Sequence, residues 1–417
     1  MKKVVLALLV LIIIAGVAFV LLRPHLAHKS YEAGLELADS AKYEQAIEKF
    51  TRAIKLNKKP AEFYHARGIA YDATNKDSMA LEDFDKAISI SDTISDFYLN
   101  RGTTYRKLRA LEKSMKDFNQ AITLNDSNAS AYFQRGLLKA SQHKYDEAIE
   151  DYNRSIELDG SNLEAFYSRG ETRAHLDDFM GAIDDYDKMI EGAEATSTAY
   201  KQRGIFKLKI QDYQGAENDL QKAAELDEND KEIYYQLGQA KHNLNKPNES
   251  VEMFNKALKL DSDYAMAYGA RGGAHLKNNK HKLAINDFTK AIKLNPEYKR
   301  AYYGRGIAKA LTTDYSGSIK DFNKVIELDK EFAQAYYNRA VSKAILGMHE
   351  EALPDYDYII KRDSRNAEAF YNRGISRMNT RDTEGACKDF QRALDLGYKQ
   401  AEPMLKMYCR NQTQIIE

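Results

Sequence analysis

The sequence is poor in cysteine and proline, and these shortages exclude several classes of protein. Two cysteines in 417 residues cannot form a zinc framework or a dense disulfide scaffold. The nine histidines are scattered, and none shows a ligand spacing such as HExxH. Six prolines and 22 glycines are few for this length, which is consistent with a mostly helical chain.

The chain also lacks a surplus of charge and any recognisable catalytic sequence. Lys+Arg and Asp+Glu number 62 each, whereas a nucleic-acid binder would need a basic surplus. The sequence contains no P-loop, no GxSxG and no phosphate-cradling glycine run. We therefore expect no enzymatic activity, no cofactor, no metal, no nucleic acid and no small-molecule substrate.

What is present is a glycine that recurs every 34 residues. Ten of the eleven multiples of 34 from Gly34 to Gly374 carry glycine, and Ala340 is the exception. A fixed period of this length, without insertion or deletion, indicates an array of helix–turn–helix repeats. With the glycine at position 8, the predicted repeats are 27–60, 61–94, 95–128, 129–162, 163–196, 197–230, 231–264, 265–298, 299–332, 333–366 and 367–400.

Each unit has the residue pattern of two antiparallel helices. Position 4 is aromatic in ten units, and Ser30 is the exception. Position 20 is Ala or Ser and position 24 is large and apolar, as in Ala386 with Phe390. Small residues facing large ones at helical spacing predict close packing of two helices.

These positions on a 34-residue period resemble the tetratricopeptide repeat. The resemblance covers residues 27–400, although position 32, often proline in the family, is proline only at Pro296. It implies an all-α, right-handed superhelical solenoid whose concave face is lined by the first helix of each repeat. It also implies a protein or peptide ligand.

Arginine at position 7 and aspartate at position 23 each occur in nine repeats, and their exceptions coincide. Repeat one has Ala33 with Lys49, and repeat seven has Leu237 with Met253. We predict that the two residues pair within a repeat as a structural ladder; the alternative is an arginine row that binds an acidic ligand. The representative pairs are Arg67 with Asp83, Arg101 with Asp117, Arg135 with Asp151, and Arg305 with Asp321.

Positions 5 and 6 are the predicted lining of the concave groove. Aromatic rings offer contact area at little entropic cost, and amides can bond to a peptide backbone of any sequence. The alternative is that position 5 only packs against the next repeat. The predicted groove residues are Phe133, Tyr167, Tyr235, Tyr303, Tyr337 and Tyr371 at position 5, and Asn100, Gln134, Gln202, Gln236, Asn338 and Asn372 at position 6.

The N-terminus carries an apolar segment. Residues 4–22 form an unbroken apolar run after Lys2 and Lys3, and Arg23 and Pro24 close it. Nineteen helical residues reach about 28 Å, close to the thickness of a bilayer core. We therefore expect residues 1–26 to be a signal-anchor with a transmembrane helix; a cleaved signal peptide is the alternative. The basic start favours a single-pass protein with its repeats on the extracytoplasmic, periplasm-like side.

Residues 401–417 are the predicted capping helix and tail. A solenoid needs a cap because its last apolar face would otherwise meet water. Met404, Leu405 and Tyr408 fall on one side of this segment. Cys387 and Cys409 lie at similar distances before and after Gly397, so an exported array would be expected to join them in a disulfide.

The function predicted from the sequence is a membrane-tethered scaffold that binds a partner protein or an extended peptide in the groove. The alternative is a non-catalytic adaptor subunit of a cell-envelope assembly or polysaccharide-export complex.

Overall fold

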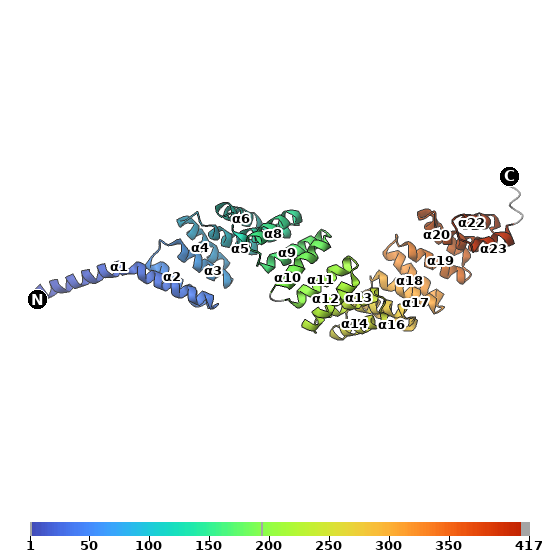
Figure 1. Cartoon of the computed structure of the whole chain (residues 1–417), viewed down its shortest axis with the longest axis horizontal. Helices are drawn as coiled ribbons and strands as arrows, with labels where there is room; N and C mark the ends of the chain where they lie inside the picture. The colour runs from blue at the N-terminus through green and yellow to red at the C-terminus, as the bar shows by residue number, and fades with distance from the viewer. Residues whose placement is uncertain (1, 193–194, 410–417) are drawn as a thin grey trace. The chain divides into compact units, whose positions relative to one another are not determined.

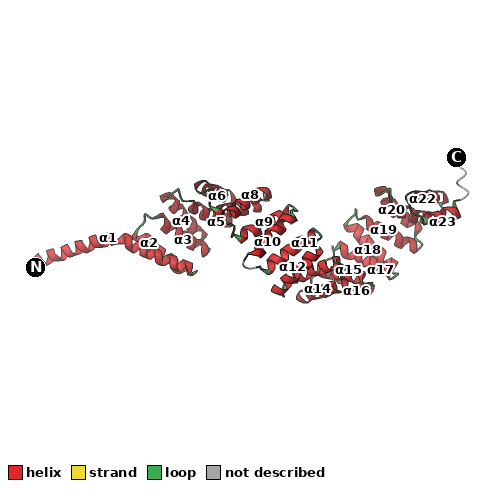
Figure 2. Ribbon diagram, viewed as in Figure 1, coloured by secondary structure: helices red, strands yellow, loops and turns green. Residues whose placement is uncertain are grey.

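The computed structural model describes residues 2–192 and 195–409, and every regular element in these ranges is a helix (Figures 1 and 2). The chain divides into two compact units, Met1–Ala195 and Thr196–Glu417. The helices of the first unit are α1 Lys2–Asp39, α2 Tyr43–Leu56, α3 Ala61–Ala73, α4 Asp77–Ile90, α5 Ser95–Lys107, α6 Leu111–Leu124, α7 Ala129–Ser141, α8 Tyr145–Leu158, α9 Leu163–His175 and α10 Phe179–Glu191.

The second unit continues the same pattern. Its helices are α11 Ser197–Lys209, α12 Tyr213–Leu226, α13 Lys231–Asn243, α14 Pro247–Leu260, α15 Ala265–Lys277, α16 His281–Leu294, α17 Lys299–Leu311, α18 Tyr315–Leu328, α19 Ala333–Ile345, α20 His349–Arg362, α21 Ala367–Asn379, α22 Thr383–Asp395 and α23 Ala401–Tyr408. In both units, consecutive helices pack as hairpins and each hairpin packs against the next.

The periodic glycine is the point of closest approach between the two helices of a hairpin. A Cβ added to Gly306 would lie 2.7 Å from Cε1 of Phe322, at position 24 of the same repeat. Phe322 itself is fully buried. The glycine is therefore required by the packing of the ring.

Two local features fix the turns. Each turn within a hairpin holds one residue with positive φ at position 15, and these φ values run from 55° at Ala41 to 77° at Gly347. The second helix of many repeats ends at Asn or Asp, whose side chain accepts a hydrogen bond from a backbone N–H two residues later. Examples are Asn125 with the N–H of Ser127 at 3.1 Å and Asp329 with that of Glu331 at 2.9 Å.

The N-terminal helix extends across a predicted domain boundary. The predicted boundary between the apolar segment and the first repeat, at residues 26 and 27, falls inside α1, which continues through Pro24 to Asp39. Proline removes a single backbone hydrogen bond and can be accommodated in a helix at the cost of local strain.

The structure does not support the predicted membrane span at residues 4–22. Within the described part of the chain, none is long and apolar enough to cross a membrane. Several side chains of the predicted span, including those of residues 12–15, lie outside the described residues.

The C-terminal cap packs on the last hairpin. Met404 and Leu405 of α23 contact the cluster built around Phe390. Tyr408, predicted to lie on the same side, is 47% exposed. Residues 410–417 of the predicted tail lie outside the described residues.

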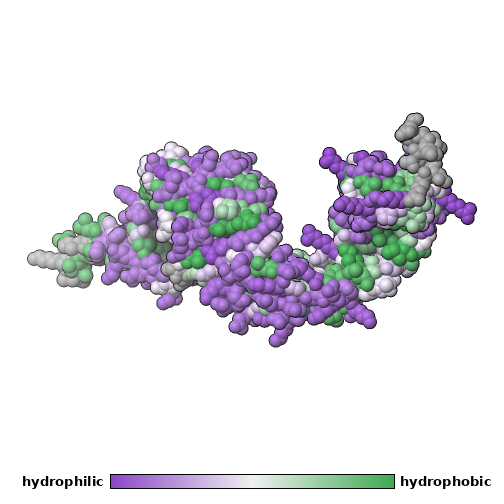
Figure 3. Space-filling view, turned by 45° about the vertical axis from the view of Figure 1, so that its right-hand side comes forward, coloured by the Kyte–Doolittle hydropathy of each residue, from purple (hydrophilic) through white to green (hydrophobic). Residues whose placement is uncertain are grey.

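Figure 3 shows a largely hydrophilic face with apolar patches between polar side chains.

Candidate functional site

Arginine at position 7 bonds to the aspartate at position 23 of its own repeat. Arg305 Nε donates to Asp321 Oδ2 at 3.0 Å and Nη2 donates to Oδ1 at 2.6 Å, while the guanidinium lies 5.5 Å from the ring of Tyr302. Asp321 is 3% exposed, so the pair is a bidentate bond to a buried carboxylate. The predicted pairs Arg67–Asp83, Arg101–Asp117 and Arg135–Asp151 have the same arrangement, at 2.7–2.9 Å.

The same arginine also reaches back to the preceding repeat, which the sequence reasoning missed. Its remaining nitrogen, Nη1, donates to the side chain at position 25 of that repeat. Arg305 bonds to Thr289 at 3.1 Å, and Arg101 bonds to Asp85 at 2.7 Å. The hydrogen bonds that Arg101 donates to Asp117 and Asp85 raise the pKa of its guanidinium. The guanidinium donors are thus used within the protein, which argues against a row of arginines free to bind an acidic ligand.

A second cation at position 11 bonds to the same aspartate. Lys309 Nζ lies 2.8 Å from Asp321 Oδ2, and Arg377 Nη1 lies 2.9 Å from Asp389 Oδ2. The signal was visible in the sequence, because a basic residue follows the arginine by four positions in most repeats, one helical turn further on.

The aromatic residues at position 5 are packed more deeply than a free groove lining would be. Phe133 and Tyr235 are each 6% exposed, whereas Tyr167 is 38% exposed. Tyr303, Tyr337 and Tyr371 are half-buried. Their rings contact position 24 of their own repeat, with centroids 5.8–6.4 Å apart. Position 5 therefore contributes to the core and exposes only part of each ring.

The amide row at position 6 faces the preceding repeat. Asn338 Nδ2 donates to the hydroxyl of Tyr303 at 3.1 Å, and Asn372 Nδ2 donates to that of Tyr337 at 3.0 Å. Asn100 Nδ2 lies 2.8 Å from His65 Nε2. Gly304, at the same position, is buried against Phe288 of the preceding repeat. It therefore does not face a groove, although position 6 was predicted to line one.

The three glutamines of the row differ. Gln236 Nε2 donates to Glu232 at 2.5 Å. Gln202 is half-buried. Gln134 Oε1 is buried and has no hydrogen-bond partner within the described residues. Several amides of the predicted partial row are therefore bonded inside the protein.

His65 occupies position 5 of repeat two as a neutral core residue. Its ring lies 4.5 Å from that of Phe97, and burial lowers its pKa to about 4, against the opposing effect of Asp96. A neutral ring can accept the hydrogen bond from Asn100, whereas a protonated one cannot.

One part of the predicted groove forms a cavity, of about 440 Å³, in the second unit. Tyr303, Tyr337 and Asn338 line it, together with Gln334, Asn366 and Glu368. Burial, and then a hydrogen bond from its hydroxyl to Glu368, raise the pKa of Tyr337. The cavity thus offers partly exposed rings surrounded by amide and carboxylate groups.

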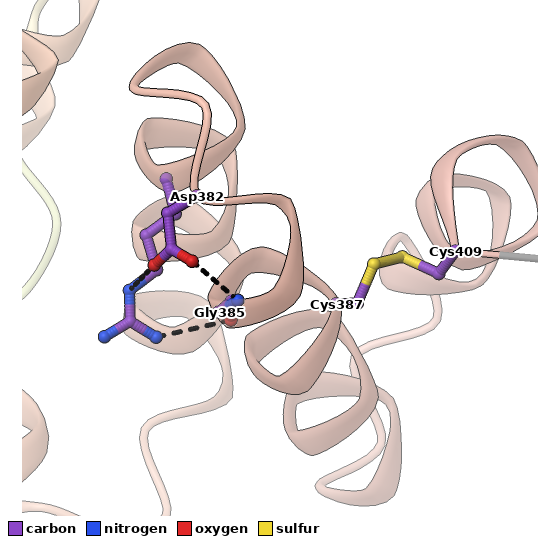
Figure 4. Close-up of a disulfide and its surroundings, with 5 residues drawn as sticks. Asp382, Gly385, Cys387 and Cys409 are labelled. Carbon is purple, nitrogen blue, oxygen red and sulfur yellow. Dashed lines mark hydrogen bonds and ion pairs between the residues drawn. A yellow bond between two sulfur atoms is a disulfide. The ribbon is translucent and has the colours of Figure 1, made fainter. Parts of the chain in front are cut away.

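Cys387 and Cys409 are brought together at the C-terminal cap. They form a disulfide with a Cα–Cα distance of 5.8 Å, joining α22 to the end of α23 (Figure 4). Each is 7% exposed. The bond holds the cap on the last repeat.

Among the described residues, no group of three or more His, Cys, Asp and Glu is placed to hold a metal ion.

Family comparisons match the repeats directly. Three family models described as tetratricopeptide repeat match the chain: one at residues 129–162, one at 95–128 and 231–264, and one at 31–93, 270–345 and 337–401. Together they cover well over half of the sequence. The chain belongs to the tetratricopeptide repeat family. Tetratricopeptide repeat proteins generally bind other proteins or peptides, and their fold is typically non-catalytic.

Several solved structures are similar to this tetratricopeptide repeat chain, whereas no curated protein matches it. YrrB, described as a protein with an unusual peptide-binding site, is 26% identical over 44% of this chain and 95% of its own, with a TM-score of 0.41. Yeast Tom70 is 16% identical over 93% and 96%, with a TM-score of 0.41. PilF of Pseudomonas aeruginosa is 16% identical over 51% and 96%, with a TM-score of 0.46.

Proposed function

We propose that this protein is a scaffold that binds an extended segment of a partner protein in the cavity at Tyr303 and Tyr337. The observation that supports this most directly is the convergence of two half-buried tyrosines and Asn338 on a cavity of about 440 Å³. Aromatic rings and Asn are well suited to bind a peptide, because the rings supply contact area and the amide can donate and accept at once.

The composition of the cavity favours a segment of mixed polarity. Of its lining residues, Ile359 is buried, whereas Gln334 and Glu368 are exposed. Arg362 also lines the cavity and forms an ion pair with Glu331. An apolar side chain against the rings, next to a polar or basic group near Glu368, would match this surface.

The test uses an exposed residue, because the tyrosines also support the core. Replacing Tyr303, Tyr337 and Tyr371 with Ala would remove packing against Phe322, Tyr356 and Phe390, so loss of binding by that variant would be ambiguous. Gln334→Trp instead fills the cavity from an exposed position. We expect it to abolish capture of the partner from solubilised membranes, as read by mass spectrometry.

Gln391→Trp, on the exposed side of α22, is the matched control for added bulk. Equal capture by both variants would contradict the proposal.

An adaptor subunit of a cell-envelope or polysaccharide-export complex would be a special case of this scaffold, and the identity of the captured partner distinguishes it.

Attachment to a membrane, with the repeats on the extracytoplasmic side, is the second part of the proposal. It is supported by the apolar run of residues 4–22 in the sequence and by the disulfide, since disulfides persist mainly outside the cytosol. Membrane fractionation of the full chain and of a chain lacking residues 2–26 tests it. Equal recovery of both in the soluble fraction would contradict attachment, and the mass of the mature N-terminus separates an anchor from a cleaved signal.

A further inference from the structure

Repeat seven interrupts the arginine ladder and leaves a cavity at the interruption. In nine repeats, the arginine at position 7 lies against the aromatic ring at position 4 of the same helix. Repeat seven keeps the ring, as Tyr234, but has Leu237 and Met253 in place of the arginine and aspartate. These three residues line a cavity of about 630 Å³.

The interior of this cavity is apolar. Leu237 is 1% exposed, and Tyr234 and Met253 are 8% and 9% exposed. Burial raises the pKa of Tyr234, with smaller contributions from Glu228 and Asp227. An apolar interior binds an apolar group by removing both surfaces from water.

The rim carries opposite charges on its two sides. Glu225 and Glu228 are exposed on the side of α12, and Lys256 and Lys259 are exposed on the side of α14. Lys256 Nζ lies 5.3 Å from the centre of the Tyr234 ring. The rim therefore favours a ligand with a cation on one side and an anion on the other.

The charges that hold repeat seven together lie elsewhere. Lys241 Nζ lies 2.6 Å from Glu217 and 2.7 Å from Glu249, and Lys246 also bonds to Glu217 at 2.7 Å. None of these residues lines the cavity. Repeat seven thus has its own ion-pair cluster, which holds the hairpin without the missing arginine.

We propose that the gap at Tyr234, Leu237 and Met253 is a second binding site, for a peptide segment of a partner protein. The segment would place one apolar side chain in the gap, with a Lys or Arg towards Glu225 and Glu228 and an Asp or Glu towards Lys256 and Lys259. The first-helix positions of this site are 4 and 7, whereas those of the Tyr303–Tyr337 cavity are 1, 2, 5 and 6. The two sites are therefore independent.

The central test restores the ladder. Leu237→Arg with Met253→Asp gives repeat seven the pair that nine other repeats carry, so the variant is expected to fold. The probes are two fluorescent nine-residue peptides with a central leucine, one with two lysines before it and two glutamates after it, and one with the reverse order. We expect one of them to bind the wild-type chain, and the double variant to weaken that binding by about tenfold or more.

Two controls locate the site. Replacing the central leucine of the peptide with serine should weaken binding to a similar extent, and Gln334→Trp, at the other cavity, should leave it unchanged. In spectra of the chain labelled with ¹³C at its methionine methyl groups, the peptide should shift the Met253 signal, assigned with Met253→Leu. A shift confined to other methionines would overturn the proposal.

A further variant exchanges charges on the rim of the cavity and leaves its apolar interior unchanged. Glu228→Lys with Lys259→Glu reverses one charge on each side, and it should weaken the peptide that binds while strengthening the peptide of reverse order. The proposal would be overturned if neither peptide bound, or if a peptide bound equally to the wild type and to the variant with Leu237→Arg and Met253→Asp. It would also be overturned if the wild-type chain self-associated and that variant did not, because a second copy of the chain would then occupy the site.

Discussion

At the scale of single residues, the arginine at position 7 joins two hairpins through one side chain. Arg305 bonds to Asp321 in its own repeat and to Thr289 in the preceding one. The planar guanidinium can donate in both directions at once, whereas lysine presents a compact charge without this fork. The recurrence of arginine is therefore explained by structure.

We expect Arg305→Leu to lower the free energy of unfolding by about 2–3 kcal/mol, because it leaves the buried carboxylate of Asp321 with Lys309 as its remaining cation. Arg305→Leu together with Asp321→Met copies the residues of repeat seven and removes the uncompensated charge. The double variant should therefore lose less stability than the single variant. Hydrogen exchange of the amides in α17 and α18 measures both, and a double variant at least as destabilised as the single one would contradict this account.

The sequence predicted the Arg–Asp pairs because their exceptions coincide, as at Leu237 and Met253. It did not predict the bond from Arg305 to Thr289, because position 25 varies among Thr, Asn, Asp and Gln. The amide row was misread for a related reason: the acceptor of Asn338 is Tyr303, 35 residues earlier. A repeat pattern shows which positions matter but not which neighbouring repeat supplies the partner.

At the scale of the helices, each hairpin depends on the contact between position 8 and position 24. Gly306 lies against Phe322, and a Cβ there would meet the ring at 2.7 Å. Repeat ten places Ala340 at this position, fully buried, so a methyl group can be accommodated once the neighbouring residues adjust.

We expect Gly306→Ala to destabilise the protein by about 1 kcal/mol or more, because overpacking outweighs the gain in helix propensity. Gly273→Ala is the matched control, since Gly273 is also inside a helix, α15, and nothing lies within 4 Å of its added Cβ. This variant should gain about 0.5–1 kcal/mol. Urea unfolding followed by circular dichroism compares the two variants. Equal changes of the same sign in the free energy of unfolding would contradict the packing argument.

The repeat helices were predictable because period, packing and turn residues all agree. The course of α1 was not, because Arg23 and Pro24 end the apolar run without ending the helix. Hydropathy changes sharply at that point while the backbone remains helical.

At the scale of the whole chain, each repeat contacts chiefly its neighbours within its unit. Stability in such an array is approximately a sum of repeat and interface terms. A complete repeat can therefore be removed if the new neighbours still fit. Deleting residues 95–128 would place Arg135 after Asp85, which now accepts the hydrogen bond of Arg101.

We expect this 34-residue deletion to give a folded chain with nearly the same helical content per residue. Deleting Gln120 alone, inside α6, should be far more damaging, because it rotates the following side chains by about 100° relative to the core. Circular dichroism and hydrogen exchange of α7 and α8 compare the two. A single-residue deletion as well tolerated as the whole repeat would contradict the neighbour-only description.

The disulfide of the cap has a consequence for the order of synthesis. Ribosomes complete Cys387 before Cys409, and Cys409 follows all eleven repeats. The bond can therefore close only after the last hairpin and α23 have been made. A chain whose synthesis stops between the two leaves Cys387 as a thiol on an uncovered hairpin. The oxidised pair is thus a chemical mark of a completed array, and a free thiol distinguishes an unfinished chain from a finished one.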